Sequence, residues 1–163
     1  MVFGWREALV AVAALFLGFL LVKLRPVSRS QRALSAEVSA ARTRARTAAT
    51  PRLRAEALCE AGEISAKHGR RFAVAAGYFL RAMKADPTSA EIIERAANAL
   101  QRRRPGLLEK LLWRRLAAVP WDDAHRAAVR SLSLALGRVY ERGALRDKAR
   151  AEVLRRLAQR LEA

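Results

Sequence analysis

Apolar residues recur at helical spacing from Leu53 to the end of the chain, and turn signals divide this part into six segments. Each segment has the length of a short globular helix, with its apolar positions three or four residues apart. The breaks fall at Gly69, Asp86-Pro87, Arg104-Pro105-Gly106, Pro120 and Gly143. Thr88 and Glu91 have the spacing of a capping box at the start of the third segment. The pattern predicts an all-α domain of six helices over residues 53–163.

A separate apolar run of fifteen residues extends from Ala8 to Val22. As a helix it covers about 22 Å, and snorkelling of the flanking Arg6 and Lys23 side chains would bring it near the roughly 30 Å of a bilayer core. Trp5 and Arg25 are the other expected membrane-flanking residues. A cleaved signal peptide is the alternative, but basic residues follow the run directly, where small residues should mark a cleavage site. We therefore expect residues 1–25 to form one transmembrane helix.

Positive charge is concentrated after this apolar run. Lys23, Arg25, Arg29 and Arg32 follow it, whereas Arg6 precedes it beside an acidic neighbour. The positive-inside rule then places the C-terminal side in the cytoplasm. The expected localisation is a bacterial inner (cytoplasmic) membrane, with a single span and a cytoplasmic C-terminal domain.

Residues 26–52 form a basic juxtamembrane connector rich in Arg, Ala and Ser. A thin heptad-like stripe runs along it at alternating intervals of four and three residues, formed by Leu34, Val38, Ala41, Ala45 and Ala48. This stripe could pair with a second copy of the chain or lie along an anionic lipid surface. A solvated, partly helical linker is the alternative.

The chain is strongly basic, with 32 Lys and Arg against 15 Asp and Glu and a formal net charge of +17. Such a charge favours anionic partners: nucleic acid, acidic lipid headgroups or an acidic protein. An Arg- and Ala-rich composition can also follow from a GC-rich genome. Nucleic acid is not favoured, because no recognised nucleic-acid motif or set of stacking aromatic residues is present.

Catalytic and metal-binding patterns are lacking in the sequence. His68 and His125 have no second histidine at ligand spacing, and Cys59 is the only cysteine, which we expect to be a buried structural thiol. Asp122 and Asp123 are better explained as residues at a helix N-terminus than as catalytic acids. The sequence predicts a protein that is not an enzyme, with no cofactor and no metal.

Paired helices recur every 34 to 37 residues, which is typical of a helical solenoid. The first pair resembles the tetratricopeptide repeat. The matching positions of its first helix and turn are Leu58, Ala61, Gly62 and Gly69, and those of its second helix are Ala75, Phe79, Ala82 and Pro87. One extra residue after Gly69 is needed for the second set. The small residues would allow a close helix crossing, with Phe79 filling the groove between the helices.

The residue spacing of this unit is repeated 74 positions later. Leu132 and Ala135 repeat the spacing of Leu58 and Ala61, and Gly143, Ala149 and Val153 repeat that of Gly69, Ala75 and Phe79. The middle unit departs from the pattern, since Arg115 replaces its second alanine. The resemblance implies a solenoid of about three repeats over residues 53–163, and a generic helical bundle is the alternative.

The resemblance implies a concave groove, formed by the first helix of each pair, that holds a peptide or a helix of a partner protein. The candidate contacts to an acidic partner are Arg102, Arg103, Arg104, Arg114 and Arg115, through bidentate guanidinium pairing. Solvated helix faces are the alternative. We expect a membrane-anchored adaptor or scaffold for protein-protein interaction; the alternative is a basic protein that binds nucleic acid or anionic lipid at the membrane. The identity of the partner and the oligomeric state stay open.

Overall fold

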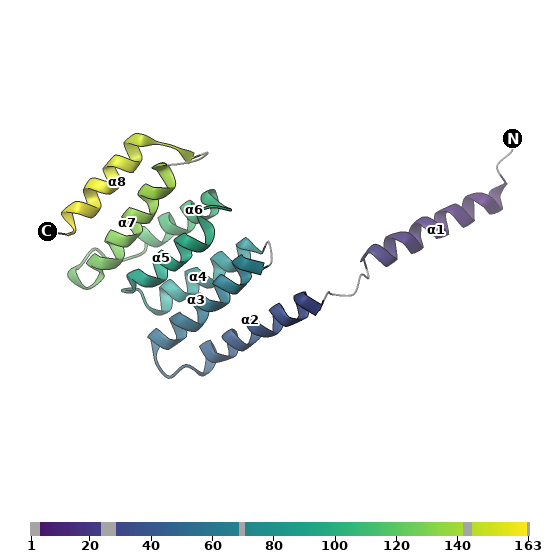
Figure 1. The fold of residues 1–163 in the computed structure, drawn as a ribbon, viewed down its shortest axis with the longest axis horizontal. Coiled ribbons are helices and arrows are strands. Elements are labelled where there is room, and N and C mark those ends of the chain that lie inside the picture. The colour runs from purple at the N-terminus through teal and green to yellow at the C-terminus, as the bar shows by residue number, and fades with distance from the viewer. Residues whose placement is uncertain (1–3, 24–28, 69–70, 142–144, 163) are drawn as a thin grey trace. The chain divides into compact units, whose positions relative to one another are not determined.

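The computed structural model describes residues 4–23, 29–68, 71–141 and 145–162 (Figure 1). Within these ranges the chain contains eight α-helices, one 3-10 turn and no β-strand, so the prediction of an all-α chain is confirmed for them. The chain divides into two units, one ending at Arg32 and one beginning at Ala33. Each unit is described by itself.

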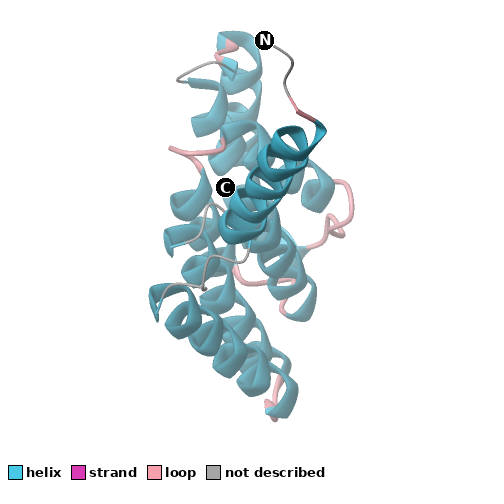
Figure 2. Cartoon of the chain, turned by 90° about the vertical axis from the view of Figure 1, so that its right-hand side faces the viewer, coloured by secondary structure: helices cyan, strands magenta, loops and turns pink. Residues whose placement is uncertain are grey.

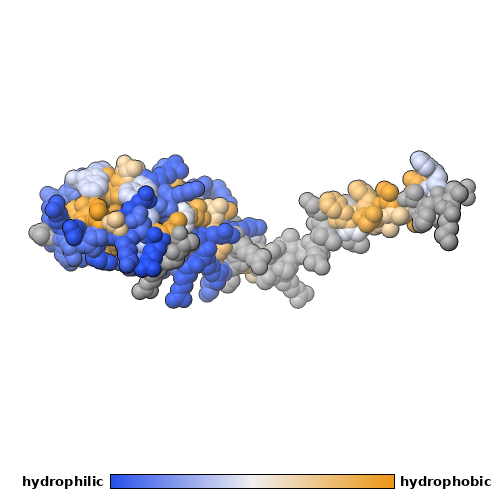
Figure 3. Space-filling model, turned by 90° about the horizontal axis from the view of Figure 1, so that it is seen from above, coloured by the Kyte–Doolittle hydropathy of each residue, from blue (hydrophilic) through white to orange (hydrophobic). Residues whose placement is uncertain are grey.

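The first unit contains α1 (Trp5–Lys23), a helix with exposed apolar side chains such as Trp5 and Leu15 (Figure 3). No helix of the described residues is long and apolar enough to cross a membrane. The predicted transmembrane helix over residues 1–25 is therefore wrong. The uncharged run from Ala8 to Val22 covers only about 22 Å as a helix, which is less than the roughly 30 Å of a bilayer core.

The four expected membrane-flanking residues are described only in part. Trp5 is 82% exposed at the start of α1. Arg6 and Lys23 belong to the same helix, but their side chains lie outside the description, and Arg25 lies outside the described residues.

The second unit is built from three helical hairpins, which supply the six helices expected after Leu53. They are α3 (Pro51–His68) with α4 (Phe72–Ala85), α5 (Ala90–Leu100) with α6 (Pro105–Leu116), and α7 (Arg126–Glu141) with α8 (Lys148–Arg160). The 3-10 turn η1 (Asp123–His125) leads into α7. The first helices of the hairpins form a row, because α5 packs against both α3 and α7, while α4 packs against α6 (Figure 1). Loops and turns connect the helices (Figure 2). This is a repeating arrangement of helical hairpins.

One apolar core runs through all three hairpins, from Ala55 on α3 to Leu154 on α8. Local signals fix where its helices begin. Pro105 starts α6, and the Ser89 hydroxyl accepts a hydrogen bond of 3.4 Å from the backbone N–H of Ile92 at the start of α5. The predicted cap at Thr88 is wrong by one position, because the Thr88 hydroxyl instead donates to Asp86 at 2.9 Å.

The crossing of α3 and α4 has the close packing that its small residues predict. Four of the repeat-signature residues, Ala61, Ala75, Phe79 and Ala82, are 0% exposed. A Cβ atom added to Gly62 would lie 2.9 Å from the Phe79 ring, so the glycine makes room for that ring. Leu58 packs at the edge of the core, the half-buried Pro87 follows α4, and Gly69 lies outside the described residues.

The spacing repeated 74 positions later agrees with the described structure only in the first helix of the third hairpin. Leu132 and Ala135 on α7 are buried, as predicted. Val153 on α8 is 66% exposed instead of occupying the place of Phe79. The core side of α8 is formed instead by Ala151, Leu154 and Ala158, and Ala149 is exposed.

Residues before Leu53 also belong to the second unit. α2 (Arg29–Thr47) packs through Val38 and Ala41 against Ala61 on α3 and Tyr78 on α4. Arg44 forms an ion pair of 2.8 Å with Glu60 on α3. The heptad-like stripe of the predicted connector is thus covered by the chain's own helices from Val38 onward.

Cys59 is expected to be unreactive until the protein unfolds. The side chain is fully buried, and this burial raises the pKa of the thiol to about 12. Because the thiolate is the nucleophile, a disulfide reagent such as Ellman's reagent should not modify the folded protein at pH 8 over minutes, whereas one thiol per chain should react in denaturant. Absorbance of the released thiolate measures both rates. Modification of the folded chain as fast as of the unfolded chain would contradict the buried position.

Candidate protein-interaction face

The row formed by α3, α5 and α7 carries a groove. This groove lies between α3 and α5 and has a volume of about 500 Å³. Its lining residues are Glu63, Ala66, Lys67, Arg95, Asn98, Ala99 and Arg103. They come from the last turns of α3, from α5 and from the turn after α5. The groove is therefore built mainly from the first helices of two neighbouring hairpins.

Arg95 and Glu63 link the two helices that form this groove. Arg95 donates from Nε and Nη2 to the two carboxylate oxygens of Glu63, at 2.8 and 2.7 Å. The hydrogen bond to Glu63 is the main cause that raises the pKa of Arg95 above its ordinary value. Glu91 on α5 adds a longer contact of 3.8 Å. The Arg95 charge is therefore neutralised within the chain, and this bidentate pair holds α3 beside α5.

Lys67 and Arg103 are the other cations of the groove, and both are exposed. No ion pair found among the described residues involves either of them. The lining thus contains three cations and one carboxylate, and the exposed amide of Asn98 can both donate and accept hydrogen bonds. The electrostatics of the groove favour a segment that carries carboxylates.

A second, smaller groove of about 240 Å³ lies between α5 and α7 and reaches α8. Arg138 on α7 donates to Glu94 on α5 at 3.1 Å, and Arg155 on α8 pairs with Glu141 on α7 at 2.6 Å. Both carboxylates are matched by guanidinium groups from the neighbouring helix. This groove is electrically balanced and offers less to a charged ligand than the groove between α3 and α5.

The structure separates the five arginines that the sequence suggested as acidic-partner contacts. Arg103 lines the α3/α5 groove, and Arg102 and Arg114 are exposed. The Arg104 guanidinium lies over the Phe72 ring, 5.5 Å from its centroid. Only Arg103 therefore joins the groove.

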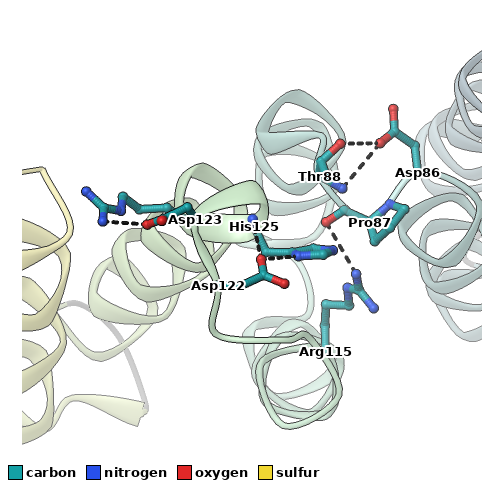
Figure 4. Close-up of polar contacts among 8 residues, drawn as sticks. Asp86, Pro87, Thr88, Arg115, Asp122, Asp123 and His125 are labelled. Atoms are coloured by element: carbon teal, nitrogen blue, oxygen red, sulfur yellow. Dashed lines mark hydrogen bonds and ion pairs between the residues drawn. The ribbon is translucent and has the colours of Figure 1, made fainter.

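Arg115 is not a surface residue, so its expected contact to an acidic partner is wrong. The residue is 6% exposed, and its Nη2 donates to the carbonyl oxygen of Pro87 at 3.3 Å (Figure 4). Burial lowers the pKa of this guanidinium. A signal for burial was present in the sequence, because Arg115 occupies the position of a small, helix-crossing residue in the repeat pattern.

Asp122 caps the short 3-10 turn before α7, as predicted for a helix N-terminus, whereas Asp123 forms an ion pair with a side chain. Asp122 accepts a hydrogen bond of 2.9 Å from the backbone N–H of His125 and contacts Nδ1 of its ring at 2.6 Å (Figure 4). The contact with the ring lowers the pKa of the Asp122 carboxyl. Asp123 pairs with Arg126 at 2.7 Å. These contacts fix the start of α7.

Sequence reasoning missed four polar residues of the α3/α5 groove: Glu63, Lys67, Arg95 and Asn98. They are polar positions on the first helices of two hairpins, which the family resemblance implies as groove-lining. Glu63 and Arg95 are also 32 residues apart, close to one repeat length. That spacing could have indicated the pair.

Comparison of the chain with protein-family models, with curated proteins and with solved structures gives no match. The class that the described residues define is therefore architectural: an all-helical array of three hairpins whose first helices lie in a row.

Proposed function

We propose that residues 33–163 form a protein-interaction module of the tetratricopeptide type, which acts as an adaptor or scaffold. The α3/α5 groove would hold an acidic peptide or helix of the partner protein. The observation that carries this proposal is the groove itself, about 500 Å³ in volume, with three cations and one carboxylate in its lining.

The pair between Arg95 and Glu63 supports binding without rearrangement. Since the pair already connects α3 with α5, the groove would be formed before the partner arrives. A preformed site reduces the ordering cost of association. Lys67 and Arg103 would then attract carboxylates of the partner, and Ala66 and Ala99 would provide apolar contact between them.

Reversal of the two unpaired charges tests this proposal. A library of fluorescent peptides rich in Asp and Glu is screened for binding by fluorescence anisotropy. The affinity of the strongest binder is then compared between the unchanged chain and a double variant that carries Lys67→Glu and Arg103→Glu. We expect the double variant to weaken binding about tenfold or more, because two exposed attractive contacts become repulsive.

The matched control changes the same charges elsewhere on the same unit. Lys110 and Arg114 are exposed on α6 and contribute no side chain to the groove lining. Lys110→Glu with Arg114→Glu should leave the affinity within about twofold at moderate salt, where distant charges are screened. Equal weakening by both double variants, or the absence of any acidic binder, would refute the proposed groove.

A further inference from the structure

Four arginines from three helices line one small cavity at the N-terminal end of the second unit. They are Arg42 and Arg46 on α2, Arg54 on α3 and Arg81 on α4, and the cavity has a volume of about 180 Å³. Ala45, Leu58 and Tyr78 complete its lining. We call this cavity the arginine notch. No carboxylate is among its lining residues.

Two of the four side chains are held in place by the chain itself. Arg54 donates from Nε to the carbonyl oxygen of Ala45 at 3.2 Å, which leaves its two terminal amino groups for other acceptors. The Arg81 guanidinium lies over the Tyr78 ring, 5.8 Å from its centroid. Such fixed guanidinium groups lose less conformational freedom when a ligand binds.

The Glu60 and Glu56 carboxylates on α3 form ion pairs with arginines that do not line the notch. Glu60 pairs with Arg44 at 2.8 Å, and Glu56 pairs with Arg52 at 3.2 Å. None of the ion pairs formed within the described residues involves an arginine of the notch. The notch therefore gathers four positive charges without an internal counterion, and neighbouring like charges favour the binding of an anion.

We propose that the arginine notch binds a phosphoryl group. A phosphoryl group carries about −1.5 to −2 charges at pH 7 and three acceptor oxygens, so it matches several guanidinium forks better than a single carboxylate does. The cavity is smaller than the roughly 300 Å³ at which sites for larger ligands begin, which suits one oxyanion. A nucleobase is disfavoured, because the Tyr78 ring is only 7% exposed and offers no open face for stacking.

The ligand chemistry is common to a free phosphate and to the phosphate of a lipid headgroup. The notch is formed by α2, the first half of α3 and α4, whereas the proposed peptide groove uses the last turns of α3, α5 and the turn after α5. The two sites share no lining residue. Either proposal can therefore fail without the other.

Titration calorimetry of the full chain with inorganic phosphate and with pyrophosphate tests the proposal. Binding should be saturable, and Arg42→Gln with Arg46→Gln should weaken it at least tenfold. Both residues are exposed on α2, and glutamine is a good helix former, so this variant should keep the fold. Arg81→Gln removes a third member from a different helix and should weaken binding independently. Arg71→Gln with Arg114→Gln is the matched control, because both residues are exposed and lie outside the notch lining.

The pH dependence distinguishes a phosphoryl site from a general anion site. A phosphate monoester gains its second charge near pH 6, and inorganic phosphate does so about one pH unit higher, so phosphate affinity should rise between about pH 5.5 and 8.5, whereas that of sulfate should not. Vesicles with phosphatidic acid, beside neutral phosphatidylcholine vesicles, then identify the source. Vesicle binding that is weakened by substitution of the notch arginines supports a lipid phosphate as the ligand. If only free phosphate binds in a notch-dependent way, a soluble ligand is supported. No saturable phosphate binding, equal weakening by the control variant, or equal pH profiles for phosphate and sulfate would overturn the proposal.

Discussion

Replacing Phe79 with alanine is expected to lower the free energy of unfolding by about 3–5 kcal/mol. The ring is 0% exposed and lies where α3 and α4 cross most closely, against the backbone of Gly62. Its removal would leave a cavity that two tightly packed helices cannot close. Urea denaturation followed by circular dichroism at 222 nm measures the change.

Val74 provides the control for this substitution. It lies on the same helix but is 48% exposed, so Val74→Ala should change the free energy of unfolding by less than about 0.5 kcal/mol. A loss below about 1 kcal/mol for Phe79→Ala would show that the ring does not fill the crossing between α3 and α4.

Gly62→Ala should destabilise the protein by about 1–2 kcal/mol, although alanine is the better helix former. The added Cβ would lie 2.9 to 3.1 Å from three atoms of the Phe79 ring. Since the ring is buried, it cannot move aside without disturbing its neighbours. The same denaturation experiment measures this effect.

Gly137, a buried glycine in the middle of α7, makes the comparison. A Cβ there would lie 3.7 Å from the carbonyl oxygen of Ala151, which is ordinary contact, so Gly137→Ala should stabilise the protein by about 0.5–1 kcal/mol. In a Phe79→Ala background the penalty of Gly62→Ala should disappear, because the obstructing ring is absent. Equal effects at the two glycines, or no coupling between Gly62 and Phe79, would contradict this packing.

Local signals in the sequence were sufficient to place the six helices after Leu53. Pro87, Pro105 and Pro120 cannot continue a helix, and helical spacing of apolar residues marks the segments between them. The close crossing at Gly62 could also be predicted, because small residues at that spacing serve helix contact. These features depend on residues near one another in the chain.

Features that depend on distant residues were not predictable in the same way. The stripe from Val38 to Ala45 looked like a surface for a second copy or a lipid layer, because its actual cover, Ala61 and Tyr78, comes from later helices. Arg115 looked exposed because arginine usually is, yet it reaches the Pro87 carbonyl across a hairpin boundary. The arginine notch likewise requires three helices to be placed together before its charge becomes visible.

The predicted transmembrane helix depends on snorkelling of the Arg6 and Lys23 side chains. The apolar run was too short by itself, and the flanking side chains were expected to supply the missing length. Snorkelling lets a charged side chain reach the headgroup region, but it adds no apolar residue to the run that faces the hydrocarbon.

Two adjacent residues on α5 reach in opposite directions. Glu94 pairs with Arg138 on α7, and Arg95 pairs with Glu63 on α3. The middle hairpin therefore presents a negative edge to one neighbour and a positive edge to the other. Insertion of that hairpin the other way round would set Glu94 against Glu63 and Arg95 against Arg138, and both contacts would be repulsive. The charges of this dipeptide therefore favour the observed order of the hairpins, in addition to the apolar core that holds them together.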